Sequence, residues 1–299
     1  MDSHFKRIGL IGWYEDERVA DSLSTLVRHL VALGLQVSID SASGARGLPD
    51  SVERRPVEEL AEGAELIVAI GGDGTMLYAA QAVIAHGVPL LGINRGRLGF
   101  LADVSPADMI ASFDAVLSGQ YQEDVRALLS ARLERPGQPP LTCHALNDIV
   151  IQKYETGRMI EFETWIGGAF VNTHGGDGLV IATSTGSTAY ALSAGGPIIH
   201  PHLDALVLAP ICPHTLSDRP IVVGRDSAIE LRLAERSPTR AQVTFDGTVL
   251  GDLDHGGRLS VGAARQSVTL LHPPGHDFFR ILRSKLHWGR SARNPDERG

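Results

Sequence analysis

Residues 65–94 read ELIVAIGGDGTMLYAAQAVIAHGVPLLGIN, and this stretch decides the fold of the first part of the chain. ELIVAI is a continuous apolar run typical of a buried strand. TMLYAAQAVIAHG then predicts a helix that ends near a glycine, and VPLLGIN predicts a further strand. Strands that alternate with helices indicate a parallel sheet covered on both faces.

The same alternation extends towards the N-terminus, and it stops further along the chain. Residues 6–13 and 35–39 predict strands, residues 16–34 an amphipathic helix, and residues 57–63 a short helix. Beyond about residue 122, short β-rich segments separated by turn residues predict a mostly antiparallel, sandwich-like β domain.

Near the C-terminus, FFRILRSKLHW puts Phe279, Leu282 and Leu286 on one helical face, which we expect to dock on the first domain. We therefore expect an α/β domain with a parallel sheet at residues 1–122, joined by residues 275–299, and a β-rich domain at residues 123–274.

Composition excludes several classes of protein. The 299 residues carry a net charge of -8, which argues against a sequence-independent grip on nucleic acid phosphates. Cys143 and Cys212 are too few for a disulfide framework, and we expect both to be buried. The N-terminal residues do not resemble a signal peptide, and no apolar run approaches membrane-spanning length. We expect a cytoplasmic protein without a membrane partner.

The first glycine loop, GGDG at 71–74, lies where a parallel strand gives way to a helix, and open α/β sheets bind ligands there. Main-chain N–H groups of Gly71, Gly72 and Gly74 can face an anion at the helix N-terminus. A carboxylate among phosphate-facing amides would repel that anion, so Asp73 suggests a proton acceptor. The alternative is a tight turn in which Asp73 caps the helix.

GGDG recurs at 175–178 in a different context. It precedes LVIATSTGSTAYALSAGGP, whose hydroxyls suit ribose and phosphate oxygens, and Ser187 or Thr188 can cap the short helix that follows. The alternative is a polar turn between strand and helix. P-loop, GxGxxG, GxSxG and HExxH motifs are absent from the sequence, and His200 and His202 alone are a weak metal signal.

An ordered series of motifs resembles the bacterial NAD kinase family, which phosphorylates the adenosine 2'-hydroxyl of NAD to make NADP. The motifs are GGDGT at 71–75, NRGRLGFLAD at 94–103, LNDIVI at 146–151, GDGLVIATSTGSTAYALSAGGPI at 176–198 and PHTLSDRPIVV at 213–223. GGDGT is shared with lipid kinases and resembles a sugar kinase loop, whereas the TGSTAYALSAGGP run is highly specific. The resemblance implies a composite active site between two domains, completed by a neighbouring subunit of a homodimer or homotetramer.

The resemblance also assigns roles to individual residues. Asp73 matches the proton acceptor, and Phe100 matches an apolar wall near the adenine, with core packing as its alternative. Asn147 and Asp148 match a pair that holds ribose hydroxyls and adenine, with an Asx turn as their alternative. The other positions that match contacts to the dinucleotide are Gly74, Arg158, Asp177, Thr188, Ala189, Tyr190, Ala191, Leu192 and Ser193.

Two departures from the family pattern concern specificity. Gly175 stands where many relatives carry an arginine, which suggests looser discrimination between NAD and NADH, and Thr248 stands where relatives often place glutamine. The expected reaction is direct transfer of the γ-phosphoryl group of ATP, with Mg²⁺ or another divalent cation carried on the ATP phosphates and no metal ligand assigned in the protein. The alternatives are a lipid or sugar kinase, and a non-catalytic dinucleotide sensor.

Overall fold

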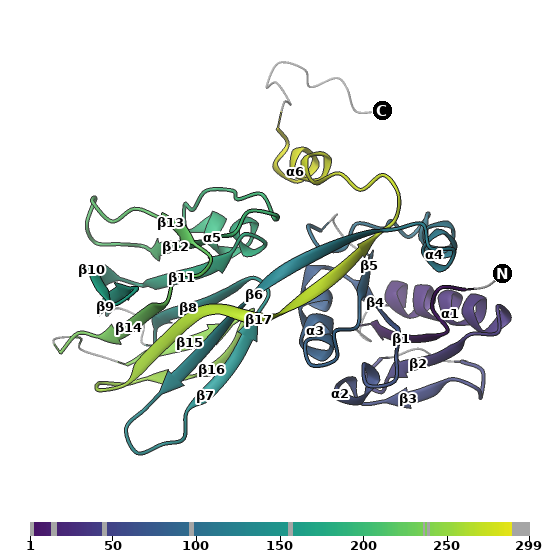
Figure 1. Ribbon diagram of the computed structural model, residues 1–299, viewed down its shortest axis with the longest axis horizontal. Helices are drawn as coiled ribbons and strands as arrows, with labels where there is room; N and C mark the ends of the chain where they lie inside the picture. Colours follow the sequence, from purple (N-terminus) through teal and green to yellow (C-terminus); the bar gives the residue numbers. More distant parts are fainter. Residues whose placement is uncertain are drawn as a thin grey trace. The chain divides into compact units, whose positions relative to one another are not determined.

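A computed structural model describes residues 3–12, 17–43, 47–95, 99–154, 158–235, 237 and 240–288. The chain forms two compact units, one of residues 1–125 and 269–299 and one of residues 126–268 (Figure 1). The chain leaves the first unit within β6 (Gln122–Glu134) and returns to it within β17 (Arg258–His272). Among the helices described, none is both long and apolar enough to cross a membrane.

The first unit is built on a parallel sheet in the order β3-β2-β1-β4-β5, to which the end of β17 adds Leu270 and Leu271 beside β5. Its strands are β1 (Arg7–Gly12), β2 (Gln36–Asp40), β3 (Glu53–Arg55), β4 (Leu66–Gly71) and β5 (Leu90–Asn94). Its helices are α1 (Glu17–Ala32), α2 (Val57–Leu60), α3 (Asp73–Val83), α4 (Met109–Leu117) and α6 (Phe278–Leu286).

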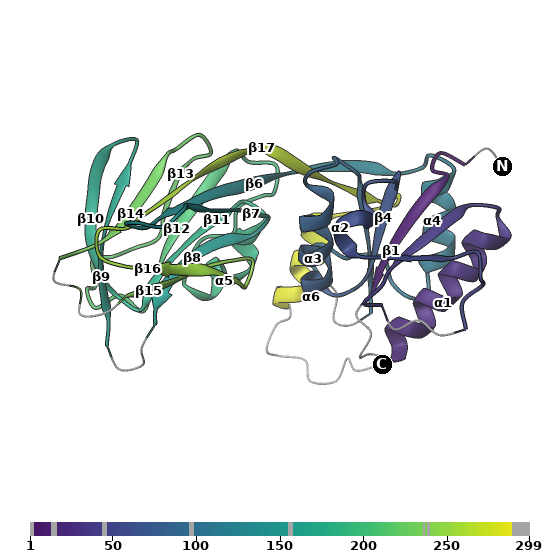
Figure 2. The same cartoon turned by 90° about the horizontal axis from the view of Figure 1, so that it is seen from below.

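The sheet of the first unit is covered on both faces (Figure 2). Ile8 and Leu10 of β1 pack in one cluster with α1 and α4. Gly9 faces the other way, and a Cβ there would lie 3.0 Å from Leu60 of α2. All six residues of β4 are buried, as a strand between two layers of helices requires.

The second unit is an antiparallel β structure. One sheet has the order β13-β12-β11-β8-β15-β16, and the other joins β10, β9, β14 and β17 with β6 and β7. The strands are β7 (Leu141–Ala145), β8 (Asp148–Lys153), β9 (Ile160–Ile166), β10 (Ala169–Gly176), β11 (Gly178–Thr183), β12 (Ala205–Ile211), β13 (Ile221–Gly224), β14 (Ile229–Leu233), β15 (Ala241–Phe245) and β16 (Thr248–Leu253). One apolar cluster draws side chains from both sheets, so they pack face to face as a sandwich.

The outer face of β8, β11 and β12 is covered as well. Val150, Val180 and Val207 pack with Ala191 and Ile199, which belong to the segment after β11. This segment contains the 3-10 helix η1 (Gly186–Thr188) and the helix α5 (Tyr190–Ser193). Burial on both faces explains the unbroken run of buried residues in β11.

The predicted fold class is confirmed: a parallel α/β unit, a mostly antiparallel β unit, and a C-terminal helix that belongs to the first unit. In the first unit, two elements were missed, the short strand β3 and helix α4. The predicted docking face of α6 was wrong in part, because Ile281 and Leu282 are buried whereas Phe279 is 54% exposed. Sequence periodicity cannot distinguish which side of a helix this short is buried.

Candidate active site

The glycines of the first loop differ in their surroundings: Gly71 is tightly packed, whereas Gly72 and Gly74 have open space beside them. A Cβ on Gly71 would lie 2.2 Å from Oγ1 of Thr75, which is buried against the loop, so packing requires glycine here. A Cβ on Gly72 or Gly74 would meet no atom within 4 Å. The main chain at these two positions is therefore open to a ligand, as the sequence predicts for an anion-binding loop.

Asp73 is the first residue of α3, yet its carboxylate bonds to a different loop. Oδ2 accepts a hydrogen bond from the N–H of Phe100 at 3.0 Å, and Oδ1 accepts from Leu101 at 3.0 Å and Ala102 at 3.4 Å. The N-cap of α3 is Gly72, with no side-chain cap bond, so the capping alternative is wrong. Three consecutive amides fix the orientation of this carboxylate.

The loop that holds Asp73 approaches it closely because it begins with glycine. A Cβ on Gly99 would lie 2.0 Å from Oδ1 of Asp73, closer than any side chain allows. The next residue, Phe100, is half-buried and packs against α6, with its ring 6.4 Å from that of Phe278 and 5.3 Å from Nζ of Lys285. Contacts with α6 thus agree with the packing alternative for Phe100.

In the second unit, a carboxylate that the sequence analysis missed organises the LND motif. Asp246 accepts hydrogen bonds from the N–H groups of Leu146 at 2.8 Å, Asn147 at 2.8 Å and Asp148 at 3.1 Å. Asp246 and Gly247, with φ of 44° and 82°, form the turn between β15 and β16. An Asp-Gly pair between two strands was the available signal, and it predicts a hairpin turn without indicating a distant contact.

Asp148 begins β8 and is buried. Burial raises the pKa of Asp148 to about 7, with a further contribution from the negative charge of Asp246. Burial also raises the pKa of Tyr190, and Cys212, Asp177 and Asp148 add to that shift. The structure therefore brings Asp148, Asp177 and Tyr190 into one electrostatic environment.

The hydroxyl-rich run after β11 mostly serves the protein itself. Thr183 donates to the carbonyl of Leu146 at 2.6 Å, and Ser184 donates to that of Leu203 at 2.5 Å. Ser187 donates to the carbonyl of Ser184 at 2.7 Å and accepts from the N–H of Ile199. These three buried hydroxyls donate to main-chain partners, which agrees with the polar-turn alternative for this part of the run.

The predicted capping in this run was wrong. Ala189 is the N-cap of α5 without a side-chain cap bond, and the hydroxyl of Thr188 donates to the carbonyl of Thr185. Tyr190 and Ser193 are exposed, Thr188, Ala189 and Leu192 are half-buried, and Ala191 lies in the core. Ala191 is fully buried and its carbonyl accepts a hydrogen bond from the N–H of Gly196, so Tyr190 and Ser193 are the exposed residues of α5.

Glycines allow the run to approach the LND motif. A Cβ on Gly186 would lie 2.1 Å from the carbonyl oxygen of Asn147. Asn147 also accepts a main-chain hydrogen bond from Thr183. This close approach joins two of the sequence motifs into one surface of the second unit.

The second GGDG turn connects β10 to β11. Oδ1 of Asp177 lies 2.7 Å from Nζ of Lys153, the last residue of β8, which sequence analysis did not single out. Gly178 has φ of 158°, and a Cβ there would lie 2.1 Å from the carbonyl oxygen of Ile151. A Cβ on Gly175 would meet only Sδ of Met159, at 3.8 Å, so that position has room for a side chain.

The remaining candidates lie apart from these contacts. Arg158 is exposed in the segment before β9, and Thr248 is exposed at the start of β16. Cys143 is buried and burial raises the pKa of its thiol to about 12, but Cys212 is exposed, so its expected burial was wrong. Cys212 adopts φ of 44° in the turn after β12, which directs this position away from the core.

A cavity of about 940 Å³ in the second unit contains none of the predicted site residues. Charged side chains line it, and Arg258 pairs with Glu134 there. Its size alone therefore does not identify it as the reactive site.

Comparisons with known proteins agree with the order of the motifs along the chain. Residues 14–121 match the ATP-NAD kinase N-terminal domain, and residues 146–272 match the ATP-NAD kinase C-terminal domain. The chain belongs to the NAD kinase family. The family predicted from the motifs is thus confirmed.

Relatives in the NAD kinase family match nearly the whole chain. The NAD kinase of Nitrosococcus oceani is 47% identical over 97% of this chain and 99% of its own. The NAD kinase of Methylococcus capsulatus is 45% identical over 96% of this chain and 99% of its own. The two glycine loops and the LND motif all lie within matched segments.

Solved structures of NAD kinases share the fold. An NAD kinase from Archaeoglobus fulgidus in complex with ATP is 26% identical, with a TM-score of 0.70 over 94% of this chain and 98% of its own. Yeast NADH kinase complexed with NADH is 23% identical, with a TM-score of 0.88 over 96% of this chain and 89% of its own. Because its sequence identity is this low, the yeast enzyme is evidence for the fold of this chain and not for its function.

Proposed function

We propose that this chain is an ATP-dependent NAD kinase that transfers the γ-phosphoryl group of ATP to the adenosine 2'-hydroxyl of NAD, giving NADP. Family membership supports the reaction, and the observation that carries the mechanism is the oriented carboxylate of Asp73. Open main chain at Gly72 and Gly74 beside it suits the approach of a phosphorylated substrate.

Hydrogen-bond capacity identifies the reactive atom of Asp73. An ionised carboxylate accepts about four hydrogen bonds. Among the residues that the structure describes, Oδ1 accepts two amides and Oδ2 accepts one. Oδ2 thus retains capacity for the 2'-hydroxyl, whose proton it takes as that oxygen attacks the γ-phosphorus in line.

In the second unit, we assign NAD binding to Asn147, Asp148, Asp177 and Tyr190 together with the α5 segment. Asp148, with its pKa near 7, can both accept and donate hydrogen bonds at neutral pH. Gly74 and Arg158 complete the proposed contacts. Because Arg158 is exposed, ligand binding would have to order its side chain.

Mg²⁺ or another divalent cation enters this scheme on the ATP phosphates, where it neutralises charge during transfer. Among the described residues, one group of ligand-type side chains could hold a metal, Asp103 with His272 and His276, and its two imidazoles do not suit Mg²⁺. We therefore assign no residue of this chain to the ATP-bound cation. We also propose that the protein is cytoplasmic and forms a homodimer or homotetramer. Analytical sedimentation would measure the number of subunits.

Replacing Asp73 by Asn tests the mechanism. The amide cannot accept the hydroxyl proton, so kcat should fall roughly 10² to 10⁴-fold while NAD binds with similar affinity. Steady-state kinetics and calorimetric titration with NAD measure the two quantities. Asp114→Asn, which changes an exposed carboxylate of α4, is the matched control and should keep full turnover. Wild-type turnover in the Asp73 variant would remove this residue from the chemistry.

The acceptor is tested separately. ATP and Mg²⁺ are incubated with the protein and NAD, diacylglycerol or fructose 6-phosphate, and ADP is measured. We expect ADP to form with NAD, and not with diacylglycerol or fructose 6-phosphate. Turnover only with diacylglycerol or with the sugar would indicate the lipid or sugar kinase alternatives, and binding of NAD without ADP formation would indicate a dinucleotide sensor.

Gly175 provides a prediction about substrate choice. We propose that the absence of a cation here loosens discrimination, so that kcat/KM for NAD and NADH differ by less than about tenfold, an interaction difference of roughly 1.4 kcal/mol. Gly175→Arg, for which the site has room, should make the two values diverge. Gly175→Gln adds similar bulk without charge and serves as the control. Strict rejection of NADH by the unaltered protein would contradict the prediction.

A further inference from the structure

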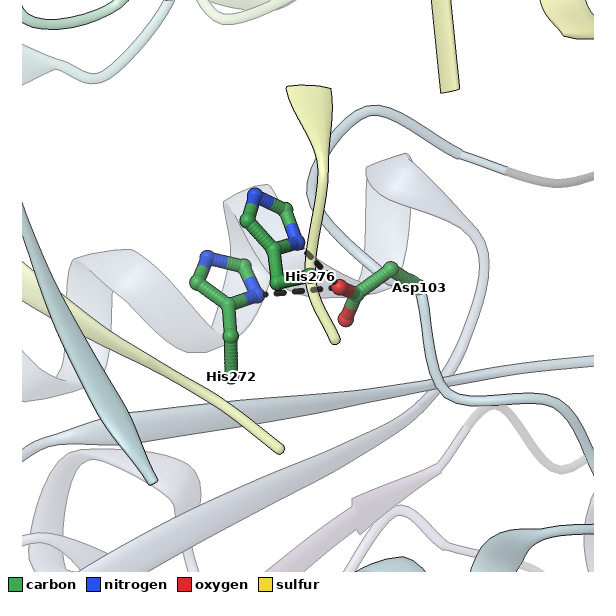
Figure 3. Close-up of side chains that lie close together, drawn as sticks. All are labelled: Asp103, His272 and His276. Atoms are coloured by element: carbon green, nitrogen blue, oxygen red, sulfur yellow. Dashed lines mark hydrogen bonds and ion pairs between the residues drawn. The ribbon is translucent and has the colours of Figure 1, made fainter. Parts of the chain in front are cut away.

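Two histidines and an aspartate meet in the first unit, outside the proposed reaction. Nδ1 of His272 lies 3.1 Å from Oδ2 of Asp103, and Nδ1 of His276 lies 2.5 Å from the same oxygen (Figure 3). The two imidazole rings stack with centroids 3.7 Å apart. Three potential ligand atoms therefore converge from three separate segments of chain: the loop after β5, the end of β17 and the loop before α6.

Hydrogen bonding leaves this cluster incompletely satisfied. Oδ1 of Asp103 is buried and accepts no hydrogen bond within the described part of the chain. On the opposite side of His272, Nε2 lies 3.4 Å from Oδ2 of Asp124, an ion-pair distance that is long for a hydrogen bond. A neutral imidazole has a single N–H, so His272 cannot donate to both carboxylates at once.

Two arrangements satisfy both carboxylates: a protonated His272 that donates to each of them, or a metal ion that replaces the proton on Nδ1. With its proton on Nε2, His272 donates to Asp124 and turns the Nδ1 lone pair towards Asp103. This is the usual arrangement of a metal-ligating histidine, whose other nitrogen donates to a carboxylate. The ion then accepts lone pairs from the two Nδ1 atoms and Oδ2, and Oδ1 lies on the same carboxylate beside it.

The dimensions of the cluster fit a small transition metal. Ligands at about 2.0 to 2.1 Å in a tetrahedron lie roughly 3.3 Å apart, so each Nδ1 must move away from Oδ2 of Asp103 by less than about 1 Å. His276 follows Pro273, Pro274 and Gly275 in a loop, and its side chain is 12% exposed. A cavity of about 360 Å³ borders Asp103 and His276 and offers an entry path and a fourth, water-bound position.

We infer that Asp103, His272 and His276 bind a Zn²⁺-type transition metal ion, with Asp124 orienting His272. Two nitrogens and one carboxylate favour Zn²⁺, Co²⁺ or Fe²⁺ over Mg²⁺. The ion would tie the loop after β5 to the start of the α6 segment. Asp103 directly follows Ala102, whose N–H contacts Asp73, so the tie also restrains the loop that orients the proposed proton acceptor.

Metal titration of the whole chain, purified without a histidine tag and stripped with a chelator, tests the site. Co²⁺ is followed by its visible ligand-field bands and Zn²⁺ by calorimetry and thermal unfolding. We expect one tight equivalent of either ion and a higher Tm with Zn²⁺. Binding of no stoichiometric ion would overturn the inference and leave a protonated His272 bridging Asp103 and Asp124.

Variants separate this site from adventitious binding. His276→Asn removes a ligand from a partly exposed loop, spares the buried His272, and should weaken Co²⁺ binding at least 10-fold and abolish the tetrahedral bands. Asp124→Asn should weaken binding roughly 10 to 100-fold. His202→Asn is the matched control, because His200 and His202 form a second histidine pair, with rings 5.1 Å apart. Unchanged binding in His276→Asn, or loss of binding in His202→Asn, would contradict the assignment.

Discussion

At the scale of single residues, two carboxylates perform the same structural task. Asp73 receives the N–H groups of residues 100–102, and Asp246 receives those of residues 146–148. Asp73 could be predicted because it stands among glycines where its charge is unexpected. Asp246 could not, because an Asp-Gly turn is fully explained by the hairpin in which it occurs.

Asp148 should make stability depend on pH. Its pKa is about 7 in the folded chain and near its ordinary value of 3.8 when unfolded. Between pH 4 and 7 the unfolded carboxyl is ionised while the folded one keeps its proton, so stability falls as pH rises through this window. The loss is of the order of 1 to 4 kcal/mol. Thermal unfolding at a series of pH values measures it.

Asp148→Asn should remove that pH dependence, because the amide does not titrate. Its Tm should fall less steeply than that of the unaltered chain between pH 4 and 7, and the two should run parallel above pH 8. Asp204→Asn, at an exposed carboxylate, is the control and should follow the unaltered chain. Parallel curves for Asp148→Asn over the whole range would show that this carboxyl is ionised when folded.

At the scale of elements, two glycines at the junction of β4 and α3 are expected to have different roles: Gly71 in stability and Gly74 in substrate binding. Gly71→Ala forces Thr75 to move and should cost about 1 to 3 kcal/mol of stability. Gly74→Ala meets no atom and places a better helix former in α3, so stability should be equal or slightly higher. Its Cβ would instead face the substrate and raise KM. Denaturant unfolding and kinetics on both variants measure these effects, and equal losses of stability would contradict the distinction.

Prediction was least successful for the segment around η1 and α5. Its residues correctly indicated a family motif, but the hydroxyls of Thr183, Ser184 and Ser187 donate hydrogen bonds to main-chain carbonyls. Whether a serine faces a ligand or the backbone depends on which strands cover it. Here Ala191 and Ile199 cover a sheet that is buried on both faces, a tertiary fact without a local sequence signal.

At the scale of the whole molecule, the first unit depends on the end of the chain. A chain that stops at Val268 would lose Leu270 and Leu271, which pair with β5, together with α6. We expect the helical circular dichroism signal, which comes mainly from the first unit, to melt at a lower temperature. A chain that stops at Trp288 keeps both elements and should melt at a higher temperature than the chain that stops at Val268. Identical melting of the two truncated chains would contradict this dependence.

The sequence predicted the two kinds of architecture and the return of the C-terminal helix, because hydrophobic period and β-branched content differ between the halves. The boundaries at residues 125 and 268 were harder to see. Each lies inside a continuous strand, β6 or β17, so no linker composition marks it.

The split of the first unit into two pieces of sequence also has a consequence during synthesis. When β5 leaves the ribosome, the strand that will border it has not been made, and all 143 residues of the second unit, 126–268, are translated in between. Between Asn94, which ends β5, and Leu270 lie 175 residues, so at roughly 5 to 20 residues per second this delay lasts roughly 9 to 35 s. During that interval Leu90 and Leu91 of β5 lack their partner strand, and the β sandwich lacks Leu259 and Val261 of β17, so one late strand completes both units.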